Sequence, residues 1–194
     1  MMVVMFMKDN DVSKIIKNGG VGVIPTDTLY GLVASAFIES AVEKVYNLKN
    51  RDEKKSLIIL ISDIEDLTKF GVEITEKAKN FIKNFWPGKV SVIFKFNNKK
   101  LSYLDRMDGT LAFRLPKNDK LITILRETGP LVAPSTNPEG MPPAKNTGEA
   151  KKYFGEGVDF YIDGGEINSL PSTLVKIEGD DIKILREGAV KIVL

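Results

Sequence analysis

The stretch GVIPTDTLYGL (residues 22–32) leaves an apolar run through a proline and then presents three short polar side chains. The apolar residues from Val21 to Ile24 predict a buried strand. Thr26, Asp27 and Thr28 follow, although a plain connecting turn would need only glycine, asparagine or aspartate. Two interpretations stay open: Asp27 or Thr28 caps a following helix, or these side chains form a pocket wall at a strand end.

The length and composition indicate one globular domain. The chain has 194 residues, enough for one hydrophobic core, and we expect a single domain over residues 1–194. The longest clean apolar run, LIILI at 57–61, is far shorter than the ~20 residues that cross a bilayer. The N-terminus lacks a basic leader and a small-residue cleavage site, so we expect no signal peptide. The absence of cysteine suits a reducing compartment, and we expect a cytoplasmic protein that does not bind membranes.

The residue types that are missing exclude several kinds of chemistry. The chain has no histidine and no cysteine, which excludes Ser-His-Asp triads, HExxH zinc sites and thiolate nucleophiles. It also has no GxxxxGK[ST] loop and no strand-linked GxGxxG, so a nucleotide would be held by cationic and hydroxyl side chains. The net charge of +2 is too small to indicate a nucleic-acid-binding protein by itself.

The hydrophobic pattern predicts an α/β fold with a mixed sheet. Helical patterns occupy about 11–20, 40–50, 75–86, 119–129 and 147–155. Strand-like runs fall at about 2–6, 21–24, 57–61, 90–96, 111–115, 131–134, 158–162, 172–177 and 182–185. Strands and helices alternate in the early part, whereas the last third is mainly strands joined by turns. We therefore expect parallel and antiparallel pairs in one sheet with flanking helices.

Two basic clusters are candidates for anion binding. Lys49 and Arg51 lie between a helical pattern and a buried strand, where their side chains could converge on an anion, although a basic run is usually a solvated face. Arg114 lies in the middle of the strand-like stretch GTLAFRLP (109–116), on the face that alternation gives to Thr110. It either protects a sheet edge or anchors a ligand in a cleft.

Three further polar positions follow or begin strands. The run at 131–134 ends at a proline and leads into Ser135, Thr136 and Asn137, which repeats the design of the opening stretch. Ser172 begins a strand-like run and Arg186 ends one. Each of these last two is individually weak, since a strand hydroxyl and a surface arginine are common. The two strand ends with short polar side chains together favour a ligand site.

Seven motifs in one order resemble a known family. They are PTDTLYGL, KNR followed by Lys55, WPGKVSVIF, GTLAFRLP, APSTN, PSTLV and LREGAV. From about residue 11 onward the chain resembles the YrdC-like threonylcarbamoyl-AMP synthase family, in its single-domain form. The resemblance implies a twisted mixed sheet with flanking helices around a large, basic, concave cleft. It also implies a nucleotidyltransferase that converts L-threonine, bicarbonate and ATP into threonylcarbamoyl-AMP and pyrophosphate, the first step of N6-threonylcarbamoyladenosine formation in tRNA.

The resemblance also assigns partners and site residues. The product would pass to a tRNA threonylcarbamoyl-transferase complex, and direct contact with tRNA or double-stranded RNA is compatible with the family. Mg²⁺ would arrive on ATP, with no metal ligand from protein side chains. Lys49 and Arg51 are the implied catalytic cations. The implied ATP-binding residues are Lys49, Arg51, Lys55, Thr110, Ser135, Asn137 and Arg186, and the implied threonine-binding residues are Thr28, Tyr30, Arg114, Ala133 (through its backbone) and Ser172.

The chain departs from the family pattern in places, and other functions stay open. Asp52 and Ser56 stand where prolines are common, and Pro143 stands where some members have a nucleotide-contacting serine. Pro-Glu-Gly follows Asn137 in place of the more usual x-Ser-Gly. The alternatives are an RNA-binding module without catalysis, a related carbamoyl-adenylate enzyme and an inert α/β domain. Threonine-dependent pyrophosphate release would separate them.

Overall fold

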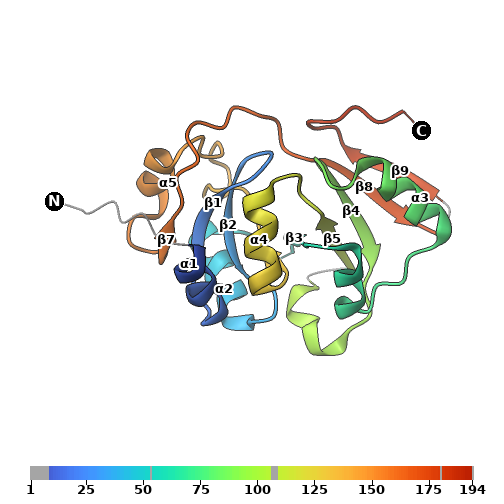
Figure 1. The fold of residues 1–194 in the computed structure, drawn as a ribbon, viewed down its shortest axis with the longest axis horizontal. Coiled ribbons are helices and arrows are strands. Elements are labelled where there is room, and N and C mark those ends of the chain that lie inside the picture. Colours follow the sequence, from blue (N-terminus) through green and yellow to red (C-terminus); the bar gives the residue numbers. More distant parts are fainter. Residues whose placement is uncertain (1–8, 53, 106–108, 180, 194) are drawn as a thin grey trace.

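A mixed β-sheet forms the centre of the molecule (Figure 1). The computed structural model describes residues 9–52, 54–105, 109–179 and 181–193, and the strand expected at about 2–6 lies outside them. The strands are β1 (Gly22–Pro25), β2 (Tyr30–Ser35), β3 (Ile58–Leu60), β4 (Val90–Lys95), β5 (Thr110–Arg114), β6 (Leu131–Val132), β7 (Phe160–Tyr161), β8 (Thr173–Glu178) and β9 (Asp181–Arg186).

The sheet has nine strands in the order β7-β1-β2-β6-β3-β5-β4-β8-β9. Three neighbouring pairs are parallel: β1 with β7, β3 with β5, and β4 with β8. The other five pairs are antiparallel. The prediction of a mixed sheet is therefore confirmed.

The opening stretch forms a hairpin, which corrects one of its two interpretations. β1 and β2 pair antiparallel from Gly22 opposite Val33 to Pro25 opposite Tyr30. A strand follows the turn, so Asp27 and Thr28 do not cap a helix, and that interpretation is wrong. The sequence analysis also did not predict β2. All six of its residues are buried, so the strand lacks the alternation that would have marked it.

Within the described residues, five α-helices flank the sheet, close to where they were predicted. They are α1 (Asp9–Lys17), α2 (Glu39–Lys49), α3 (Glu76–Phe85), α4 (Asp119–Thr128) and α5 (Thr147–Phe154). Side-chain caps begin three of them: Thr75 before α3, Asn118 before α4 and Asn146 before α5 each accept a hydrogen bond from the first turn. Two 3-10 helices, at Ile64–Phe70 and Lys99–Leu104, were not predicted. No helix of the described residues has the length and apolar character needed to cross a membrane.

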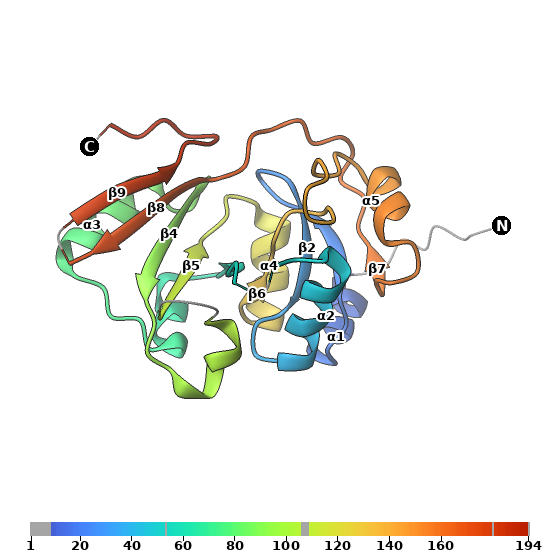
Figure 2. The same ribbon diagram turned by 180° about the vertical axis from the view of Figure 1, so that it is seen from behind.

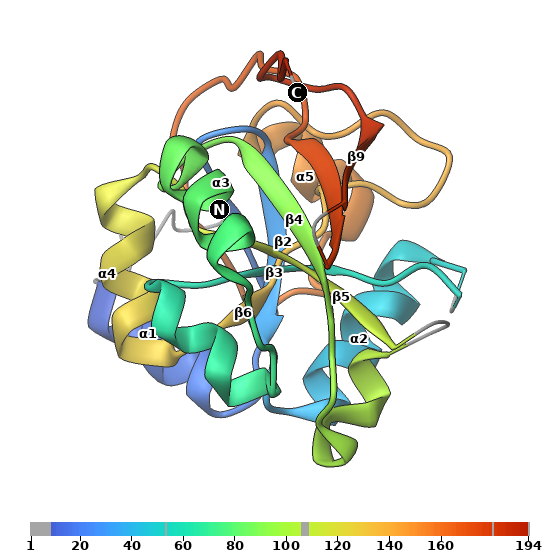
Figure 3. The same ribbon diagram turned by 90° about the vertical axis from the view of Figure 1, so that its right-hand side faces the viewer.

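The helices bury two hydrophobic clusters against the sheet. α1 and α4 lie side by side on one face, and α2 lies on the other, as Figures 2 and 3 show. The cluster beneath α1 and α4 includes Ile16, Leu125, Val33 and Leu60. The larger cluster includes Phe113, whose ring contacts Phe70 edge-on with centroids 5.0 Å apart. These two cores hold the strands firmly and leave the polar turns and strand ends to form a site.

Candidate active site

A cavity of about 520 Å³ opens where the β1–β2 turn meets the ends of several strands. Its volume is typical of small-molecule sites. Four cations line it, and no carboxylate does so among the described residues. Eight of the predicted site residues line this one cavity: Thr28, Tyr30, Arg51, Arg114, Ala133, Ser135, Ser172 and Arg186. The structure therefore brings together most of the residues that the sequence singled out.

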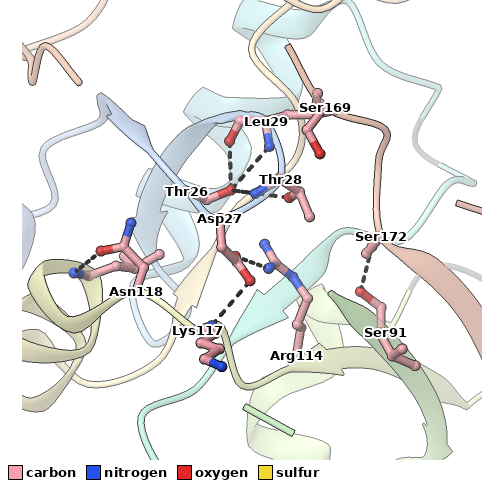
Figure 4. Close-up of polar contacts among 12 residues, drawn as sticks. Thr26, Asp27, Thr28, Leu29, Ser91, Arg114, Lys117, Asn118, Ser169 and Ser172 are labelled. Carbon is pink, nitrogen blue, oxygen red and sulfur yellow. Dashed lines mark hydrogen bonds and ion pairs between the residues drawn. The ribbon is translucent and has the colours of Figure 1, made fainter. Parts of the chain in front are cut away.

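The β1–β2 turn is organised by the hydroxyl of Thr26. This hydroxyl donates to the Leu29 carbonyl (2.6 Å) and accepts from the Thr28 and Leu29 amides (3.1 and 3.2 Å). It also lies 3.1 Å from the Thr28 hydroxyl, as Figure 4 shows. Thr28 is thus held at the cavity wall by a closed local network. Thr26 lines the cavity as well and was not among the predicted site residues.

Arg114 forms a buried ion pair with Asp27. Arg114 lies at the end of β5, and its Nη1 donates to Asp27 Oδ1, with both side chains over nine-tenths buried (Figure 4). The backbone N–H of Lys117 also donates to Asp27, at 3.1 Å. In the part of the chain that the structure describes, the buried Arg114 Nε has no hydrogen-bond partner. β5 lies between β3 and β4, so Arg114 does not protect a sheet edge. Its contact with a ligand stays a prediction.

Tyr30 lines the cavity, and its hydroxyl contacts a neighbouring loop. The hydroxyl donates to the Gly165 carbonyl (2.7 Å) and accepts from the Gly164 amide (2.9 Å). Burial raises the pKa of this phenol. Tyr30 therefore stays neutral at physiological pH and joins the hairpin to the segment that precedes β8.

Lys49 joins the basic segment at the end of α2 to the polar segment that follows β6. Its ammonium donates to the carbonyls of Ser135 and Asn137, each at 2.5 Å, and the Glu139 amide donates to the Lys49 carbonyl (2.7 Å). The side chain is 1% exposed and does not line the cavity. Burial, with a smaller effect of the nearby Arg51 charge, lowers the Lys49 pKa to about 7. Lys49 and Ser135 thus lie on the same side of the molecule, as the resemblance requires.

Three other residues expected at the nucleotide do not line the cavity. The Asn137 amide donates to the carbonyls of Pro138 (2.9 Å) and Met141 (2.8 Å), and so shapes the loop behind the cavity wall. Lys55 forms an ion pair with Glu139. Thr110 lies at the opposite end of β5 from Arg114. Their contact with a nucleotide stays a prediction.

Arg51 is positioned by its own loop. Its Nε donates to the Lys55 carbonyl (3.0 Å) and its Nη2 to the Ser56 carbonyl (3.1 Å). Arg51 lines the cavity, so these two contacts fix the orientation of the guanidinium while other donors remain for a ligand. Ala133 also lines the cavity, and its amide donates to the Ile58 carbonyl (2.8 Å).

The last two strands complete the cavity. The Ser172 hydroxyl lies 2.8 Å from that of Ser91, which is fully buried in β4 and was missed by the sequence analysis. Nη2 of Arg186 donates to the Ser172 carbonyl (2.9 Å), and burial lowers the pKa of this guanidinium. The Thr173 hydroxyl donates to the Val190 carbonyl (2.5 Å), which ties the chain after β9 to the start of β8.

Comparisons with known proteins show the family of the chain. The family model Sua5/YciO/YrdC, described as telomere recombination, matches residues 14–188. A Methanocaldococcus jannaschii protein whose name assigns it to the threonylcarbamoyl-AMP synthases is 37% identical over 92% of this chain and 84% of its own length. Threonylcarbamoyl-AMP synthase of Bacillus subtilis is 34% identical over 91% of this chain, which spans 52% of that protein.

The fold is also similar to the folds of solved structures. Sua5 of P. abyssi, solved with L-threonine, superposes with a TM-score of 0.87 at 28% identity, over 93% of this chain and 54% of that one. YciO of E. coli superposes with a TM-score of 0.85 at 24% identity, over 94% of this chain and 90% of that one. The predicted fold class is therefore confirmed.

Proposed function

The chain belongs to the Sua5/YciO/YrdC family, and from this we propose that it is an L-threonylcarbamoyladenylate synthase. It would act as a nucleotidyltransferase that converts L-threonine, bicarbonate and ATP into threonylcarbamoyl-AMP and pyrophosphate, for the modification of tRNA. One observation carries the proposal: a single cavity gathers Arg51, Arg114 and Arg186 with the hydroxyls of Thr28 and Ser172. Such a cavity suits a small zwitterion next to a polyphosphate.

The two ends of the cavity would take different substrates. Arg114 would bind the threonine carboxylate through the guanidinium donors that Asp27 leaves free, with Thr28 and Ser172 beside the amino acid. Arg51 and Ser135 would contact the nucleotide. ATP would enter as its Mg²⁺ complex, and this metal belongs to the substrate.

The chemistry requires positioning more than proton transfer. The threonine amine and bicarbonate combine to a carbamate with loss of water. A carbamate oxygen then attacks the α-phosphorus, and the bond to the bridging oxygen breaks in line as pyrophosphate leaves. The cations would hold the two anionic reactants together and stabilise the charge on the phosphates. This division of work explains how a chain without histidine or cysteine can catalyse the reaction.

The reaction predicts a strict requirement for threonine. Incubation with ATP, Mg²⁺, bicarbonate and one amino acid at a time should release pyrophosphate strongly with L-threonine only, and mass spectrometry should identify threonylcarbamoyl-AMP. L-allo-threonine and L-valine are the matched controls, since the first inverts only the stereocentre at Cβ and the second replaces the hydroxyl by a methyl group. Salt-sensitive RNA binding without threonine-dependent pyrophosphate release would refute the proposal and favour a binding module.

The lowered pKa of Lys49 makes the stability of the protein depend on pH. Its folded pKa, about 7, lies below the ordinary value of 10.5, so the unfolded chain binds more protons than the folded chain between these values. The free energy of unfolding should therefore rise with pH in this window, by about 2 kcal/mol from pH 7 to pH 9. The Lys49→Met variant should lack this increment.

Denaturant titrations of the wild type and of Lys49→Met at pH 7, 8 and 9 measure the free energy of unfolding. Lys152→Met, a substitution of an exposed lysine on α5, controls for the loss of a surface charge. The prediction is contradicted if the free energy of unfolding depends on pH in the same way in the wild type and in Lys49→Met.

A further inference from the structure

We propose that Lys145 binds a phosphate group of the nucleotide and supplies a cation that the sequence analysis did not assign to the site. This inference rests on the proposed function, since it names a further residue of the same cavity. Lys145 lines the cavity together with Arg51, Arg114 and Arg186.

The backbone around Lys145 is fixed on both sides. The Ala144 amide donates to the Thr136 carbonyl (2.9 Å), and Ala144 is buried. Pro143 and Lys145, on either side of it, both line the cavity, which is the alternation expected of an extended segment. The Lys145 carbonyl accepts from the Ile167 amide (2.8 Å) across the cavity wall. The side chain thus extends from an anchored position on the wall.

The backbone N–H of Lys145 has an acidic partner, whereas its ammonium has none. Glu149, in the first turn of α5, accepts the backbone N–H of Lys145 at 2.8 Å. Among the described residues, no hydrogen bond or ion pair engages the Lys145 ammonium. The charge is therefore available to an anion that enters the cavity.

The other cavity cations already have protein partners. Arg114 pairs with Asp27, while Arg51 and Arg186 donate to backbone carbonyls. Lys49 and Lys55, which were expected at the nucleotide, are engaged by carbonyls and by Glu139.

A triphosphate is a polyanion, and Asp27 already neutralises the charge of Arg114, so a further cation at the cavity wall would strengthen the binding of the nucleotide. Lysine suits this role, because its ammonium is a compact charge on a flexible stem and can follow pyrophosphate as it leaves. The stem is exposed at the cavity wall, so it can move without disturbing the core.

Removal of the Lys145 ammonium should weaken nucleotide binding and leave threonine binding unchanged. Lys145→Ala should raise the Kd of ATP, measured by isothermal titration calorimetry without threonine, by about tenfold, the usual effect of one charge-assisted hydrogen bond. Lys145→Arg should restore most of the affinity. The KM for L-threonine should stay within about twofold of the wild-type value, since the amino acid is held by Arg114.

Lys152→Ala is the matched control, because Lys152 is an exposed lysine on α5 that does not line the cavity. Equal ATP affinity of Lys145→Ala and wild type would overturn the assignment, as would a rise in the threonine KM alone. The binding measurement needs no turnover, so it stays informative if the wild type binds ATP but releases no pyrophosphate. In that case the proposed reaction fails, while the role of Lys145 is still decided.

Discussion

Arg114→Ala should lower kcat/KM for L-threonine by roughly 30- to 1000-fold, which corresponds to the ~2–4 kcal/mol lost with one buried charged contact. The wild-type guanidinium is held by Asp27 and lines the cavity, and its Nε has no hydrogen-bond partner among the described residues. Alanine lacks both the positive charge and the two parallel N–H donors with which a guanidinium binds a carboxylate. Pyrophosphate release across a threonine series measures the loss, and most of it should appear in KM.

This substitution also leaves Asp27 buried without its partner. Removal of one member of a buried ion pair usually costs ~3–5 kcal/mol of stability, so the variant requires its own control. The double variant Asp27→Ala/Arg114→Ala removes both charges and should recover much of the stability but none of the activity. Recovery of activity in the double variant would show that Arg114 acts on folding and not on threonine.

Arg51→Ala should reduce pyrophosphate formation at least a hundredfold while the fold stays intact. Arg51 lines the cavity, and two carbonyls of its own loop orient its guanidinium. Loss of one preorganised donor to a charge that develops in the transition state commonly costs ~3–4 kcal/mol. Initial rates at saturating threonine and ATP measure the effect on kcat.

Two variants make this test specific. Arg51→Lys keeps the charge but cannot contact two carbonyls and a phosphate in the same plane, so it should recover only part of the rate. Lys54→Ala removes an exposed cation from the same loop and should change the rate less than twofold. Near-normal rates for Arg51→Ala would exclude it from the reaction.

The helices were predictable because local signals mark them. Thr75 caps α3 and Gly129 follows α4, and residues of these types are common signals of helix ends in a sequence. β2 was not predictable from alternation, because the sheet and the helices bury it on both faces. The 3-10 helix at Ile64–Phe70 is too short for a periodic pattern to mark it.

The residues of the site were more predictable than their contacts. Thr28 was found from the short polar side chains after a strand-like run, and Arg114 from its charge in the middle of another, and both line the cavity. Asp27 was seen in the sequence but not assigned, because its partner is 87 residues away along the chain. Ser91 gave no signal, since a serine in an apolar strand is common and its partner is 81 residues away. The carbonyls that engage Lys49 belong to the backbone, which no residue type reveals.

The strands that are synthesised after β6 lie at the two edges of the sheet. β7 lies at one edge of the sheet, and β8 and β9 lie at the other, so the strands made last flank those made first. On the ribosome, a nascent chain that has reached the end of β6 already contains the hairpin, Arg51 and Arg114, but neither Ser172 nor Arg186. The complete cavity can therefore form only after β8 and β9 have been made, and a fragment that stops before β8 would lack the side of the cavity that Ser172 and Arg186 line.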